Sequence, residues 1–121
     1  MNLIRITGTT NTASAAPTLG PLLLHHGRFG DSSEWFENPA DSLPARLREA
    51  GYDVYLTNKR GTKPSRTHAT LDPNTAAYWN FTYDQIANND LTASVSGVLK
   101  TRGTDGLSCE KVQILTNHIG A

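Results

Sequence analysis

Short apolar segments alternate with helical patterns along the chain. Four segments are typical of strands, because each is either continuously apolar or alternates apolar with polar residues: Asn2–Thr7, Pro21–His25, Asp53–Asn58 and Lys111–Leu115. Apolar residues at helical spacing predict one helix that begins at Leu43 and another over Tyr83–Leu99. Strands that alternate with helices predict an α/β fold, with a mostly parallel sheet of about four strands and helices flanking it.

The first predicted helix has clear signals at both ends. Ser42 can cap its N-terminus and Gly51 can end it. Leu43, Leu47 and Ala50 fall on one side of this helix. We therefore expect these three residues to face the sheet.

Composition narrows the class of protein. The 121 residues suffice for one small domain, and 11 Lys and Arg balance 11 Asp and Glu. A net charge of zero argues against nucleic acid or an acidic membrane surface as a partner, and no apolar run approaches the length of a spanning helix. The single cysteine, Cys109, excludes an internal disulfide and a thiolate metal cluster.

The N-terminal segment allows two interpretations. Residues 1–30 hold no acidic side chain and are rich in Ser and Thr, which is typical of organelle transit peptides. The same composition fits a first strand followed by a loop, and we favour that interpretation because no amphipathic face stands out. The compartment stays open.

Four segments together resemble the acid lipase family, which includes the gastric and lysosomal acid lipases. His26-Gly27 followed by Ser32-Ser33-Glu34-Trp35 is similar to the family's His-Gly and Ser-x-x-Trp motifs. The other three segments are Ala50-Gly51-Tyr52-Asp53-Val54, Asn58-Lys59-Arg60-Gly61 with Ser65-Arg66-Thr67-His68, and Tyr78-Trp79-Asn80-Phe81-Thr82-Tyr83-Asp84 with Asp90-Leu91. The family has Asn-Ser-Arg-Gly where this chain has Lys59 in place of the serine.

This resemblance implies a partial α/β-hydrolase fold. Residues 1–121 would form a truncated acid lipase-like domain, similar to the N-terminal half of the family and ending at the nucleophile elbow. The family is typically lysosomal or secreted and hydrolyses lipid esters.

The elbow is where the sequence departs most from the family. This strand-to-helix turn normally reads Gly-x-Ser-x-Gly, and here the matching residues are Thr116, Asn117, His118, Ile119 and Gly120. His118 occupies the nucleophile position, and a register shift of one puts Ile119 there instead. Neither is a serine, cysteine or aspartate, so we expect the catalytic triad to be lost.

The oxyanion hole is expected to persist only as a vestige. In the family, one backbone N–H donor follows the His-Gly pair, here His26-Gly27, and a second follows the nucleophile. These donors map to Arg28 and Ile119. Without a nucleophile they would stabilise no intermediate.

Other chemically interesting residues are expected to be structural. Adjacent strand residues point to opposite faces, so His25 and His26 are not expected to form a metal pair. We expect Asp31, Arg60 and Asp90 to anchor loops, and Cys109 to be an incidental thiol. Four aromatic residues are expected to pack in the core: Trp35, Trp79, Phe81 and Tyr83. No metal or cofactor is expected.

Two classes of function follow. The first is a non-catalytic structural or interaction subunit, a pseudoenzyme, with a protein partner covering the sheet edge at Lys111–Leu115. The second is a fragment, or one chain, of a lipid-ester hydrolase whose triad is completed elsewhere. The substituted elbow favours the first.

Overall fold

The sheet has four strands, three of them parallel. The computed structural model describes residues 1–9, 16–107 and 111–117. The strands are β1 (Asn2–Arg5), β2 (Pro21–His25), β3 (Asp53–Asn58) and β4 (Gln113–Thr116), in the spatial order β1-β3-β2-β4. β2 pairs in parallel with both β3 and β4, and β1 runs antiparallel to β3. The predicted α/β class with a mostly parallel sheet is confirmed.

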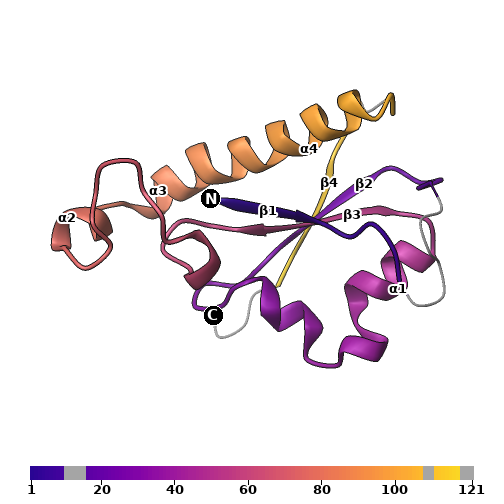
Figure 1. Ribbon diagram of the computed structural model, residues 1–121, viewed down its shortest axis with the longest axis horizontal. Coiled ribbons are helices and arrows are strands. Elements are labelled where there is room, and N and C mark those ends of the chain that lie inside the picture. The colour runs from indigo at the N-terminus through magenta and orange to yellow at the C-terminus, as the bar shows by residue number, and fades with distance from the viewer. Residues whose placement is uncertain (10–15, 108–110, 118–121) are drawn as a thin grey trace.

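Helices cover both faces of the sheet (Figure 1). The helices of more than one turn are α1 (Leu43–Glu49) and α4 (Thr92–Thr104), and shorter helical segments are η1 (Ser32–Phe36), η2 (Pro39–Asp41), η3 (Lys63–Ser65), α2 (Ala76–Trp79) and α3 (Tyr83–Gln85). A π-helical segment, η4 (Ile86–Leu91), joins α3 to α4. The helix predicted over Tyr83–Leu99 is therefore real but continues to Thr104.

The central strands β2 and β3 are buried on both faces, which explains their apolar sequences. On one face, Leu24 and Leu56 pack with Trp35 and Leu47. On the other face, Leu23, Tyr55 and Val98 of α4 form a second cluster. Because successive side chains along a strand point to opposite faces of the sheet, the apolar residues of β2 and β3 form two small hydrophobic cores, one on each face.

Helix α1 has the predicted ends but not the predicted buried side. The Ser42 side chain accepts a hydrogen bond from the Ala45 N–H, and Gly51 takes a positive φ of 108° just beyond the helix. However, Leu43 and Ala50 are exposed, whereas Pro44 and Arg48 are buried. The expected face was wrong for these residues because a two-turn helix presents only one narrow stripe to the sheet.

The buried side of α4 is largely polar. Every fourth residue is buried, beginning with Asp90 in the preceding η4 and continuing in α4 with Ser94, Val98 and Arg102. Arg102 pairs with Asp53 of β3, and Ser94 is hydrogen-bonded to Thr57. Leu99, expected on the apolar side, is 40% exposed. Ion pairs and hydrogen bonds therefore act together with the packing of Val95 and Val98 to hold this helix on the sheet.

Strand β4 lies at the edge of the sheet and all four of its residues are exposed. It starts two residues later than predicted from the sequence. No helix in the described part of the chain is long and apolar enough to cross a membrane.

Candidate functional site

The carboxyl ends of the three parallel strands meet at one edge of the sheet. There His25 ends β2 and His26 follows it, Lys59 follows β3, and Thr116 ends β4 and Asn117 follows it. These residues line a hollow of about 550 Å³ that also includes Gly27, Arg28, Tyr83, Ile86, Ala87 and Leu91. In open α/β sheets, ligands bind outside the carboxyl ends of the strands.

This hollow brings together the candidate residues from both ends of the chain. His26, Gly27 and Arg28 lie in the loop after β2, and Thr116 and Asn117 lie across from them. The remaining elbow positions, His118, Ile119 and Gly120, lie outside the described residues, as does Cys109.

His26 is a buried structural residue of the loop after β2. Its Nε2 accepts a hydrogen bond from the Lys59 backbone N–H at 3.3 Å, which requires Nε2 to be unprotonated. Its Nδ1 therefore carries the proton and donates to the Gly27 carbonyl at 2.9 Å. Burial lowers the pKa of His26, which favours this neutral form.

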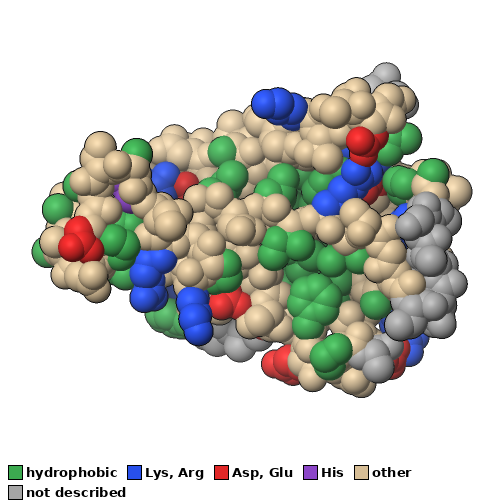
Figure 2. Space-filling view, viewed as in Figure 1, with side chains coloured by type: hydrophobic (Ala, Val, Ile, Leu, Met, Phe, Trp, Pro, Cys, Tyr) green, Lys and Arg blue, Asp and Glu red, His purple; other side chains and the backbone are tan. Residues whose placement is uncertain are grey.

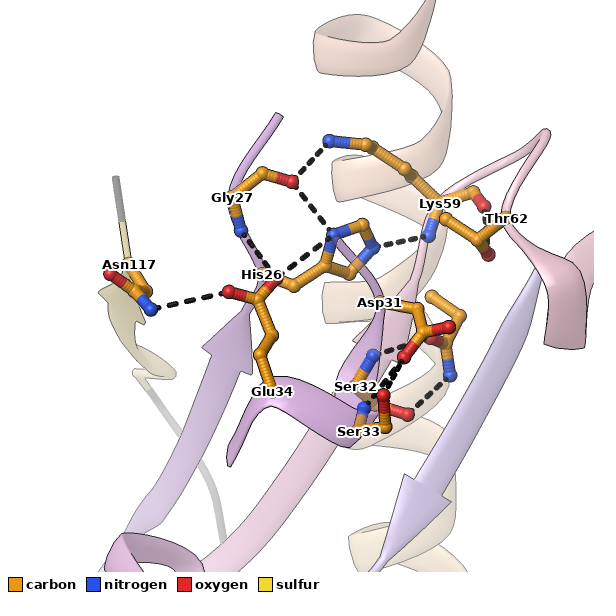
Figure 3. Close-up of polar contacts among 10 residues, drawn as sticks. His26, Gly27, Asp31, Ser32, Ser33, Glu34, Lys59, Thr62 and Asn117 are labelled. Carbon is orange, nitrogen blue, oxygen red and sulfur yellow. Dashed lines mark hydrogen bonds and ion pairs between the residues drawn. The ribbon is translucent and has the colours of Figure 1, made fainter. Parts of the chain in front are cut away.

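Gly27 is held from two sides. The Lys59 ammonium donates to its carbonyl oxygen at 2.8 Å, and its N–H donates to Glu34 Oε1 at 3.2 Å (Figure 3). Burial lowers the pKa of Lys59. These contacts fix the backbone immediately before Arg28, the expected oxyanion donor.

Glu34 also reaches the end of β4. Asn117 Nδ2 donates to Glu34 Oε2 at 3.2 Å, and the Asn117 backbone N–H donates to the His25 carbonyl at 3.2 Å. Sequence reasoning assigned no role to Glu34 or Lys59. Two features of the sequence could have pointed to them. Glu34 lies inside the Ser-x-x-Trp segment, and Lys59 replaces the serine of the family's Asn-Ser-Arg-Gly motif.

Other polar residues anchor the loops, as expected. Asp31 caps η1 by accepting from the Ser33 N–H at 2.8 Å, and this bond together with that of the Ser33 hydroxyl lowers the pKa of Asp31. The Asp90 carboxylate accepts from the Arg60 backbone N–H and from its Nε, both at 2.9 Å. These contacts fix the loops after β2 and β3.

The expectation that four aromatic residues pack in the core was wrong for three of them. Trp35 packs against the core cluster of Leu22 and Leu24, but Trp79 is 45% exposed and Tyr83 is 60% exposed. Trp79 and Phe81 lie in a segment beyond the end of the sheet, where they pack around the buried Tyr78. They line a second, larger hollow of about 1000 Å³.

The described part of the site positions backbone but offers no activated nucleophile. Among the described residues, neither His25 nor His26 is hydrogen-bonded to a Ser, Thr or Cys side chain. A serine-hydrolase mechanism needs such a pair. What the geometry does provide is a preorganised loop that could present a backbone N–H to a ligand oxygen.

Comparison with known proteins shows clear relatives. The chain is 38% identical to Triacylglycerol lipase 2 of Arabidopsis thaliana over 101 residues, which is 83% of this chain and 23% of that protein. It is 41% identical to the Lysosomal acid lipase/cholesteryl ester hydrolase of Homo sapiens over 85 residues, 69% of this chain and 21% of the relative. Identity to the Gastric triacylglycerol lipase of Bos taurus is 32% over 104 residues, 85% of this chain and 26% of the relative.

The resemblance noted from the sequence motifs is thereby confirmed, as is the partial α/β-hydrolase architecture. The chain spans about a quarter of the length of these relatives. No protein-family model matches it.

Proposed function

We propose that this acid lipase-like chain keeps the strand-and-loop frame of a lipase without a catalytic nucleophile of its own, and that it serves as a structural or interaction subunit. One observation carries the proposal: the elbow positions read Thr116-Asn117-His118-Ile119-Gly120. Histidine or isoleucine at the nucleophile position cannot form an acyl-enzyme, because neither offers a hydroxyl or thiol to attack the ester. Residues 1–121 thus form an acid lipase-like domain with a substituted elbow.

In this proposal the loop after β2 is a remnant of the loop that supplies one oxyanion-hole donor in the family. Glu34 and Lys59 fix Gly27, so the backbone of Arg28 is positioned next to the end of β4. In this proposal Arg28 and Ile119 occupy the positions of the two residues that supply the oxyanion-hole N–H groups in the family. Backbone donors persist through side-chain change, but they stabilise an oxyanion only where a nucleophile generates one.

The interaction part of the proposal rests on β4. Ile114 is 42% exposed and Leu115 is 40% exposed on a strand that pairs only with β2 in the described sheet. An edge strand with free backbone groups is a template for pairing with another chain. We therefore place a protein partner along Lys111–Leu115, with its own strand added to this edge.

A second candidate is one chain of a lipid-ester hydrolase whose triad is completed by another segment. The observation that favours it is the double anchoring of Gly27, which is the preorganisation that ester hydrolysis requires of an oxyanion donor. Its substrates would be lipid esters, as the names of the relatives indicate for those proteins.

Labelling with a fluorophosphonate tests whether the chain has a nucleophile of its own, and a mixing experiment separates the two candidates. We expect no labelling of the chain, with an intact acid lipase as the positive control in the same reaction. Stoichiometric labelling of any residue would overturn the proposal. Ester hydrolysis that appears on mixing with a chain carrying the remaining part of an acid lipase would also overturn it and support the second candidate.

The edge contact is tested by size-exclusion chromatography combined with hydrogen exchange. We expect the chain to associate with itself or a partner, and Ile114→Lys to reduce association. Leu99→Lys is the matched control, because Leu99 has similar exposure but lies on α4. A monomer with strong amide protection along β4 would contradict the proposal.

A further inference from the structure

The larger hollow adjoins the first one, with which it shares Arg28, Lys59, Tyr83 and Ile86. It lies between the loop after β2, the loop after β3 and the segment 79–86, and it encloses about 1000 Å³. A hollow of this size accommodates a small organic molecule. It includes no residue of the elbow, and we call it the aromatic hollow.

Its apolar lining is formed by aromatic rings with solvent-facing area. Phe29 is 82% exposed, Tyr83 is 60% exposed and Trp79 is 45% exposed, while Phe81 is half-buried. Trp79 and Phe81 have ring centroids 6.1 Å apart, so their faces form one continuous wall. Aromatic groups gathered in a concave surface are typical of a ligand site.

Basic side chains outnumber acidic ones in the charged lining, which has Arg28, Lys59, Arg60, Lys63 and Arg66 against Asp31, Glu34 and Glu37. Among the described residues, no carboxylate lies within ion-pair distance of Arg28, Lys63 or Arg66. Three carboxylates also line the hollow, those of Asp31, Glu34 and Glu37; Asp31 and Glu34 accept hydrogen bonds from neutral groups and keep their negative charge. Figure 2 shows basic and hydrophobic side chains next to one another at the end of the molecule that carries α2 and α3.

The arginines are held over the aromatic rings. The Arg28 guanidinium lies 5.0 Å from the ring centroids of both Phe29 and Tyr83, and that of Arg66 lies 5.5 Å from Trp79. A guanidinium stacked on a ring keeps N–H groups at its edge for an oxyanion ligand. The stacking thus places hydrogen-bond donors for an anion next to the apolar surface of the rings.

We propose that the aromatic hollow binds a single-chain amphiphile with a phosphate head, such as an alkyl phosphate. The alkyl chain packs on Trp79, Phe81 and Phe29, and the head lies among Arg28, Lys63 and Arg66. A phosphate monoester carries about 1.5 to 2 negative charges and three acceptor oxygens, which matches several unpaired cations better than one carboxylate does. This proposal goes beyond the proposed function and does not depend on it, because it uses no elbow residue.

Tryptophan fluorescence of the full chain tests the proposal. The chain has two tryptophans, and Trp35→Phe leaves Trp79 as the reporter inside the hollow. We expect dodecyl phosphate, below its micelle concentration, to change this emission saturably. Inorganic phosphate should bind at least about tenfold more weakly because it lacks the chain, and dodecyl maltoside should not compete because it lacks the charge.

Variants of the lining residues distinguish binding in the hollow from non-specific binding elsewhere on the protein surface. Lys63→Gln and Arg66→Gln should each weaken binding on the order of fivefold through loss of a charge-assisted contact, and Glu37→Gln should strengthen it. Lys100→Gln, an exposed lysine on α4, should change nothing. Trp79→Leu, followed by calorimetry in the chain with Trp35 present, should weaken binding by removing apolar contact.

Three results would overturn the proposal: equal binding of dodecyl maltoside, equal binding of inorganic phosphate, or affinity for dodecyl phosphate that is unchanged in the Lys63 and Arg66 variants. Absence of saturable binding would also overturn it. None of these results affects the fluorophosphonate test, so the two proposals fail independently.

Discussion

Asn117 and Glu34, 83 positions apart in the sequence, are joined by a hydrogen bond of 3.2 Å from Asn117 Nδ2 to Glu34 Oε2. The other oxygen of the same carboxylate accepts from the Gly27 N–H. One side chain in η1 therefore connects the loop after β2 with the end of β4. The shape of the candidate site depends on this carboxylate.

Replacing Glu34 with alanine should loosen both loops. The Gly27 N–H and the Asn117 amide lose their acceptor, and each unpaired polar group costs about 1 kcal/mol or more where water is excluded. We expect a lower free energy of unfolding in urea and faster hydrogen exchange at the Gly27 amide. Glu37→Ala, an exposed neighbour, is the control and should leave that amide unchanged.

Asp53 should govern stability in acid. It is 1% exposed and accepts hydrogen bonds from Arg5 at 2.8 Å and Arg102 at 2.6 Å. Burial alone would raise the pKa of Asp53, but the bonds from the two arginines outweigh it and the pKa is lowered. Because the folded pKa lies below the unfolded value of about 3.9, this stabilisation is present above that pH and is lost as the pH falls through the folded pKa.

Asp53→Asn should therefore cost about 3 kcal/mol at neutral pH, since it leaves two arginine charges without their buried partner. The difference from the unsubstituted chain should shrink as the pH falls from 5 towards 3. Asp105→Asn, which removes an exposed partner of Arg5, should have a small effect at any pH. Equal losses in the two variants would contradict this account.

His25 should make stability depend on pH in a different range. Burial, with smaller effects from His26 and Lys59, lowers the pKa of His25 to about 4. The unfolded chain binds the proton near pH 6.5 and the folded chain does not, so stability falls as the pH drops from about 6.5 towards 4. His25→Gln should flatten this part of the profile, which urea unfolding at a series of pH values measures. An unchanged slope would show that another group titrates.

Gly61 should not tolerate a side chain. Its φ is +84°, and a Cβ there would lie 2.8 Å from Trp79 Cζ3 and 3.2 Å from Phe81 Cζ. Gly61→Ala is expected to cost about 1–3 kcal/mol through backbone strain and contact with the rings. It should also weaken alkyl phosphate binding by moving the aromatic wall.

Gly103 provides the matched control. It lies in α4, and a Cβ there would meet nothing within 4 Å. Gly103→Ala should raise the melting temperature by increasing helix stability about 0.5–1 kcal/mol. Stabilisation by both substitutions would mean that Gly61 is not constrained as described.

Local sequence patterns were enough to predict several elements of the fold. The apolar runs of β2 and β3 and the Ser42 cap of α1 lie where they were predicted, because burial on both faces and end capping leave direct signals in neighbouring residues. The motifs around His26-Gly27 and Asn58–Gly61 also sufficed to indicate acid lipase relatives.

Which polar residues form hydrogen bonds with one another became clear from the three-dimensional arrangement alone. The buried residues of η4 and α4 include Asp90, Ser94 and Arg102 but not Leu99, because the partners of these polar groups lie on β3 and the loop after it, thirty or more residues earlier in the chain. Likewise, Glu34 and Lys59 belong to the site because their side chains bond Gly27, which lies in a loop for which hydrophobic periodicity makes no prediction. Periodicity reports burial, whereas hydrogen-bond partners depend on how the crossovers bring distant strand ends to one edge of the sheet.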